Sequence, residues 1–155
     1  LRGYRGKCEN LHGHNYKIEI YARGRELDNV GLLVDFVELK AAADEVVTYL
    51  DHRNINELPP FDELQPSAEN LAKYVLERVS QRVGDERVQI YKVRCFETPT
   101  SVATMPVNTL TTGTAKRCRN EGRQAARKQH VGMAIAPTIS APAASDAGRS
   151  GSEKS

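Results

Sequence analysis

The stretch "HNYKIEIYA" at residues 14–22 gives the first indication of the fold. Its residues alternate in character, so every second side chain falls on the same face of an extended backbone. The more apolar face carries His14, Tyr16, Ile18, Ile20 and Ala22. A period of two is typical of a β-strand with one buried face. We therefore expect a half-buried strand here, followed by a turn-rich break at residues 23–31.

Two segments with helical spacing follow this strand. Asp35 is suited to cap the first helix, with Glu38 in the capping-box position. The apolar stripe of this helix consists of Leu39, Ala42, Ala43, Val46, Val47 and Leu50. A loop at residues 56–66 leads to a second helix, for which Ser67 is the expected N-cap. Its stripe consists of Leu71, Ala72, Val75, Leu76 and Val79.

Residues 87–97, "RVQIYKVRCFE", are rich in β-branched and aromatic side chains and predict a second strand. Residues 100–105, "TSVATM", predict a short third one. The order is strand, helix, helix, strand, strand, without internal repeats. This order favours an α+β fold, in which an antiparallel sheet carries both helices on one face.

The chain has 155 residues, enough for one domain with a substantial core. Residues 1–105 hold 14 Lys and Arg against 17 Asp and Glu, whereas residues 106–155 hold 8 against 3. The second segment contains no aromatic residue and little that can be buried, so we expect a disordered basic tail at 106–155. Residues 115–130 are compatible with a short basic helix. A nucleic-acid-binding arm is the alternative to a solvated tail, and we favour the tail.

The cellular compartment and the partners are inferred from the apolar stretches and the cysteine content of the sequence. No stretch is apolar enough for a membrane span or a signal peptide, and three cysteines make a poor disulfide framework. We expect a cytoplasmic protein that binds neither membrane nor nucleic acid.

A thiol and two imidazoles lie close together in "CENLHGH", residues 8–14. His12 and His14 project to the same side of an extended backbone, roughly 7 Å apart at their Cα atoms, and can share one Zn²⁺. Two such histidines alone are more often ordinary surface residues. Cys8 is an inert small side chain by default, but a nearby metal or cation favours its thiolate, which is a base or nucleophile.

Three further residues are candidates for proton transfer or binding. Asp51 directly precedes His52, and an aspartate bonded to an imidazole fixes its tautomer and raises its basicity. A solvent-exposed pair at a helix end is the alternative. Glu97 follows the second strand, where a carboxylate either remains solvated or grips two N–H groups of a heterocycle through parallel bonds.

Five blocks in order resemble one family. They are "CENLHGHNY" (8–16), "LVDFVELK" (33–40), "LDHRNIN" (50–56), "PSAENLA" (66–72) and "CFETPTS" (95–101). The chain is similar over residues 1–105 to the 6-pyruvoyltetrahydropterin synthase and 6-carboxytetrahydropterin synthase family of the queuosine pathway. The resemblance implies the tunnelling fold, an antiparallel sheet with two helices on one face, assembled as trimers that stack into hexamers. The family's first strand, with its first zinc histidine, is expected upstream of residue 1, which would leave one sheet edge bare.

The resemblance also implies roles for single residues. His12 and His14 correspond to two of three zinc ligands, and Cys8 to the catalytic base. Asp51 and His52 correspond to the proton-relay pair. Glu97 corresponds to the acid that anchors the pterin, and Ser67 falls in the block that lines the pterin pocket.

The spacing between Cys8 and His12 bears on the reaction. Only Glu9, Asn10 and Leu11 separate them, which the resemblance associates with the carboxy-type branch. We therefore expect a zinc-dependent lyase that converts 7,8-dihydroneopterin triphosphate to 6-carboxy-5,6,7,8-tetrahydropterin, acetaldehyde and triphosphate, in queuosine biosynthesis. The alternatives are a 6-pyruvoyltetrahydropterin synthase, which eliminates triphosphate in the tetrahydrobiopterin pathway, and a non-catalytic pterin-binding fragment.

Overall fold

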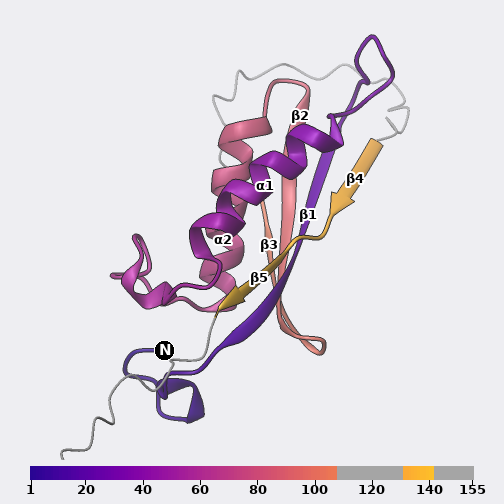
Figure 1. Ribbon diagram of the computed structural model, residues 1–155. Coiled ribbons are helices and arrows are strands. Elements are labelled where there is room, and N and C mark those ends of the chain that lie inside the picture. The colour runs from indigo at the N-terminus through magenta and orange to yellow at the C-terminus, as the bar shows by residue number, and fades with distance from the viewer. Residues whose placement is uncertain (108–130, 142–155) are drawn as a thin grey trace, which may run out of the picture.

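The computed structural model of the protein describes residues 1–107 and 131–141. Their strands form an open antiparallel sheet, and two helices lie against one face of it (Figure 1). The strands are β1 (His14–Gly24), β2 (Val88–Thr98), β3 (Ser101–Pro106), β4 (Val131–Ile135) and β5 (Thr138–Ala141). The helices are α1 (Phe36–Leu50) and α2 (Ala68–Val83), with single 3-10 turns η1 (Lys7–Glu9) and η2 (Ile55–Glu57). The predicted fold class is confirmed.

β1 lies inside the sheet, with β2 on one side and β4 and β5 along the other. Its burial alternates as the sequence predicts, because Tyr16, Ile18, Ile20 and Ala22 are all buried. The opposite face of β1 carries polar side chains such as Lys17 and Glu19. A register shift between Tyr21 and Ala22 marks a bulge against β2.

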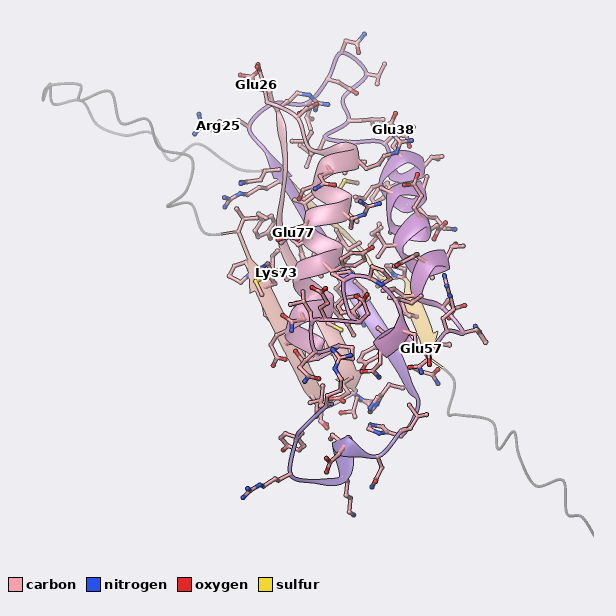
Figure 2. All side chains as sticks on the ribbon, turned by 90° about the vertical axis from the view of Figure 1, so that its left-hand side faces the viewer. Arg25, Glu26, Glu38, Glu57, Lys73 and Glu77 are labelled. Carbon is pink, nitrogen blue, oxygen red and sulfur yellow. The ribbon has the colours of Figure 1, made fainter. Side chains whose placement is uncertain are left out.

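Both helices begin at the predicted caps. The Asp35 carboxylate accepts a hydrogen bond from the Val37 amide at 2.8 Å, and the Ser67 hydroxyl accepts one from the Asn70 amide at 3.3 Å. These bonds satisfy amides that the first helical turn cannot pair internally. The predicted stripes face the sheet and form the core with β1 and β2. On the outer face of α2, Lys73 and Glu77 form a surface ion pair of 3.9 Å (Figure 2).

Residues 131–141 depart from the prediction of a disordered tail at 106–155, of which residues 108–130 and 142–155 lie outside the described residues. β4 and β5 pair with β1 along the edge that the sequence analysis expected to be bare. Ile139 is 1% exposed and belongs to the core, against which Met133 and Ile135 are partly buried. The strands were missed because each is too short to show a clear period of its own. The segment at 115–130, which is compatible with a short basic helix, lies among these undescribed residues.

None of the helices in the described ranges is long and apolar enough to cross a membrane.

Candidate active site

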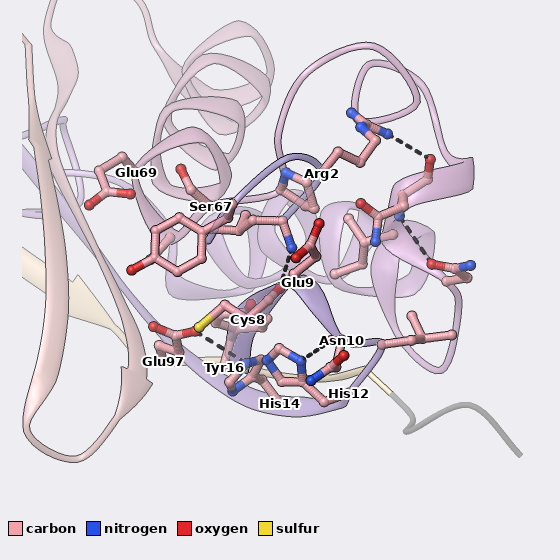
Figure 3. Close-up of a pocket in the computed structure, with 18 of the residues that line it drawn as sticks. Arg2, Cys8, Glu9, Asn10, His12, His14, Tyr16, Ser67, Glu69 and Glu97 are labelled. Atoms are coloured by element: carbon pink, nitrogen blue, oxygen red, sulfur yellow. Dashed lines mark hydrogen bonds and ion pairs between the residues drawn. The ribbon is translucent and has the colours of Figure 1, made fainter. Parts of the chain in front are cut away.

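A cavity of about 650 Å³ opens where β1 begins and β2 ends (Figure 3). Its wall combines the η1 segment, the first residues of β1, the start of α2 and the last part of β2. The predicted site residues that line it are Cys8, His12, His14, Ser67 and Glu97. Residues from segments far apart in the sequence therefore meet at one cavity. Asp51 and His52 are not among its lining residues.

His14 and Glu97 contact each other inside this cavity. The Nε2 atom of His14 lies 3.2 Å from a carboxylate oxygen of Glu97. Burial lowers the pKa of His14, against the opposing effect of Glu97, and the neighbouring His12 lowers it further. Burial therefore favours the neutral imidazole at neutral pH.

The two histidine rings contact each other edge to face, with centroids 4.5 Å apart. His12 Nδ1 is 2.6 Å from the Asn10 carbonyl oxygen. Since a carbonyl oxygen only accepts, Nδ1 must carry the proton, and the lone pair of neutral His12 is then on Nε2. This arrangement orients His12 as metal-binding histidines are commonly oriented.

The donors present do not complete a metal centre. In residues 1–107 and 131–141, no group of three or more His, Cys, Asp or Glu side chains is arranged to hold an ion. Zinc sites take three or four protein ligands. His12 and His14 supply two nitrogens, and the Nε2 of His14 is engaged by Glu97.

Cys8 lies in the 3-10 turn η1. Two main-chain hydrogen bonds close this turn, from the Glu9 amide to the Gly6 carbonyl and from the Asn10 amide to the Lys7 carbonyl. The Cys8 side chain is partly buried and free of disulfide bonding. Buried Tyr16 lies close by, and burial raises the pKa of its hydroxyl, with smaller contributions from Glu97 and the two cysteine thiols, Cys95 and Cys8. At neutral pH this hydroxyl therefore keeps its proton.

Tyr16 and Glu69 are lining residues that the sequence analysis did not single out as binding groups. Tyr16 was placed only on the apolar face of the strand, although that face also carries His14, which is the signal that could have identified it. Glu69 occupies the first turn of α2, beside the predicted Ser67. Arg53 directly follows the Asp51–His52 pair and lines the same cavity.

The two arginines of the cavity wall differ in how firmly hydrogen bonds hold their guanidinium groups. Arg2 donates to the carbonyl oxygens of Phe61 at 2.9 Å and Leu64 at 2.6 Å, which ties its guanidinium to the loop before α2. Arg53 makes one long bond of 3.5 Å to the Tyr49 carbonyl and stacks over that tyrosine ring at 5.6 Å. Arg53 is therefore the better placed of the two to receive an anion.

The Asp51–His52 pair lies at the end of α1. His52 Nδ1 is 2.8 Å from a carboxylate oxygen of Asp51, and the His52 side chain is 74% exposed, so the pair is both bonded and solvent-exposed. The other carboxylate oxygen accepts the Ser140 amide at 2.7 Å. The bond from Ser140 and then the one from His52 lower the pKa of the Asp51 carboxyl.

Comparison with known proteins places these features in a family. The family model described as 6-pyruvoyl tetrahydropterin synthase matches residues 1–107. The 6-pyruvoyl tetrahydrobiopterin synthase of Poecilia reticulata is 33% identical over 63% of this chain and 67% of its own length. The dihydroneopterin monophosphate aldolase of Pyrococcus furiosus is 37% identical over 52% of this chain and 67% of its own. The chain thus spans about two thirds of these two relatives.

A solved structure agrees with these matches. The structure of Caenorhabditis elegans 6-pyruvoyl tetrahydropterin synthase is 32% identical, with a TM-score of 0.60 over 66% of this chain and 75% of that one. The similarity therefore extends to the fold as well as the sequence.

Proposed function

The chain belongs to the 6-pyruvoyl tetrahydropterin synthase family, and from this we propose that it is a lyase that eliminates triphosphate from 7,8-dihydroneopterin triphosphate. The observation that carries the proposal is that Cys8, His14 and Glu97 line one cavity within the matched residues. Such a cavity contains a thiol that can remove a proton and a carboxylate that can bind the N–H groups of a heterocycle. The synthases named among the relatives support elimination over the carboxy-type reaction that the sequence analysis favoured.

In this proposal each group has a distinct task. The Glu97 carboxylate accepts two parallel N–H bonds from the pterin ring and so fixes the position of the substrate side chain. The Cys8 thiolate removes a proton from that side chain as general base. Arg53, held by one long bond, binds the triphosphate. Ser67 caps α2 and shapes the wall of the pterin pocket.

If a metal ion binds here, His12 and His14 would supply two of its ligands; we propose zinc, which would act as a Lewis acid toward the side-chain oxygens of the substrate. Two donors are fewer than a zinc site needs, so no step above depends on the ion.

The Asp51–His52 pair is proposed as the proton relay on the other side of the substrate. It does not line the cavity of its own chain. We therefore propose a homo-oligomer, a trimer or a stacked hexamer, in which the pair of one copy reaches the cavity of another.

The carboxy-type reaction is the second candidate, because Cys8 and His12 are separated by only three residues. It differs from simple elimination by releasing acetaldehyde together with triphosphate. The product therefore distinguishes the two reactions on the same substrate.

The test is incubation of the full chain, supplied with zinc, with 7,8-dihydroneopterin triphosphate. Triphosphate and acetaldehyde are quantified separately, with Cys8→Ala as the matched blank. Triphosphate without acetaldehyde is expected. Equimolar acetaldehyde would establish the carboxy-type reaction instead. Pterin binding without either product would identify a non-catalytic binding protein and overturn the lyase proposal.

A further inference from the structure

Ser140 of β5 contacts the Asp51–His52 pair with both of its main-chain groups. Its amide donates to the Asp51 carboxylate at 2.7 Å, and its carbonyl oxygen accepts the His52 amide at 2.6 Å. Two hydrogen bonds of the Ser140 main chain thus join the end of α1 to β5, although Ser140 is 89 positions from Asp51 in the sequence. β5 lies outside residues 1–107, which are the residues that match the family.

The register of β5 explains why Ser140 is available. β5 runs antiparallel to β1, with Ile139 opposite Tyr16 and Ser140 opposite Asn15, and the Pro137 carbonyl accepts from Ile18. In such a ladder, alternate residues direct their main-chain groups toward the partner strand. Pro137 and Ile139 face β1 in this way, so Ser140 directs its amide and carbonyl outward, toward Asp51 and His52.

β5 is itself firmly placed. The Ile139 side chain is 1% exposed and lies in the core, and the adjacent Ser140 is partly buried. The anchoring residue and the contacting residue are therefore neighbours, so Ser140 cannot move far without withdrawing Ile139 from the core.

The backbone of His52 needs such a support. Its φ of 54° is in the left-handed region, which is unfavourable for a residue with a side chain. The bond from its amide to Ser140 holds this conformation, and the conformation in turn lets the ring fold back so that Nδ1 meets the Asp51 carboxylate.

We propose that β5 is a positioning element for the proton relay, with the Ser140 main chain fixing both the Asp51 carboxylate and the His52 ring. The relay role rests on the proposed function, whereas the positioning does not. With one carboxylate oxygen held by Ser140, the other is directed to His52 Nδ1, which leaves His52 Nε2 as the atom that can take up or release a proton.

The test deletes one N–H. Ser140→Pro removes the amide proton at a position whose amide is not part of the ladder with β1, and Ser140→Ala keeps it. The readout is the titration of the Asp51 carboxyl carbon, followed by NMR in the full chain. The pKa of Asp51 should rise toward its ordinary value in Ser140→Pro and stay lowered in Ser140→Ala. An unchanged titration in Ser140→Pro would overturn the proposal.

Activity provides the second readout. With dihydroneopterin triphosphate, Ser140→Pro should lower kcat about ten- to hundredfold, by analogy with the partners that orient metal-binding histidines, with KM little changed. A wild-type chain without lyase activity would contradict the proposed function. The Asp51 titration would still show whether Ser140 positions the Asp51 carboxylate.

A third variant guards against an effect of the proline ring. Lactic acid at position 140, compared with alanine there, replaces the N–H by oxygen and adds no ring. If proline unfolds β5, this ester must raise the pKa of Asp51 by itself, and failure to do so would overturn the proposal.

Discussion

His14 and Glu97 share one short contact, 3.2 Å between Nε2 and a carboxylate oxygen, although the proposed roles assign them to different ligands. His14 would bind a metal and Glu97 a pterin. Each group therefore engages an atom that the other group would use to bind its own ligand. Binding of either ligand breaks the pair, so the two binding events are expected to favour each other.

Glu97→Gln should weaken pterin binding, because an amide cannot accept two parallel N–H bonds as a carboxylate does. Losing a hydrogen bond to a charged group costs about 1.5–3 kcal/mol, which is about one to two decades in affinity. Glu69→Gln is the matched control, since Glu69 lines the same cavity. Calorimetry with a pterin should show the larger loss for Glu97→Gln, and a larger loss for Glu69→Gln would move the anchor to α2.

Cys8→Ala should abolish turnover while pterin binding persists. A general base contributes about 10²–10⁴-fold, and the partly buried thiol adds little to packing. The measurement is triphosphate release alongside calorimetric pterin binding. More than a tenth of wild-type activity in the variant would assign proton removal to another group.

Zinc content should depend on the histidines and not on the thiol. After dialysis against zinc, Cys8→Ala should hold as much zinc as the wild type, whereas His12→Ala and His14→Ala should hold less. Elemental analysis measures all four proteins side by side. Loss of zinc from Cys8→Ala would make the thiol a ligand, and Cys8 would then not be a free base.

The sequence identifies much of this fold because its signals are local. The alternation in β1, the two stripes and the caps Asp35 and Ser67 each depend on neighbours within a turn or a strand. β5 could not be predicted in this way, because its four residues are too few to show a pattern. They form a strand only by pairing with β1, which is far away in the sequence. The cavity residues were likewise found as motifs, but the separation of Asp51–His52 from the cavity is a property of the tertiary structure alone.

Acid should weaken the fold through its hydrogen-bonded carboxylates. Glu19, Asp28, Asp51 and Asp85 all have lowered pKa values, chiefly because of hydrogen bonds to the carboxylate. A lowered folded-state pKa contributes stability that is present above the unfolded value and lost as pH falls through the folded one. In urea unfolding, the contribution of these carboxylates to the free energy of unfolding should be constant at pH 6–7 and should fall below about pH 4. Asp51→Asn should reduce that loss.

Ile139→Ala should destabilise the protein strongly, contrary to the behaviour of a disordered tail. Ile139 is 1% exposed, and replacing a buried isoleucine by alanine typically costs about 2–5 kcal/mol through lost burial and the cavity left behind. Val102→Ala is the control, because Val102 is 42% exposed on β3 and exposed sites usually change stability by less than about 0.5 kcal/mol. Urea unfolding followed by circular dichroism compares the two variants with the wild type. Equal stability for Ile139→Ala and wild type would mean that β5 does not pack on β1 in solution. The contact between Ser140 and Asp51 would then be lost with it, so this stability measurement is the prerequisite for interpreting the Ser140 variants.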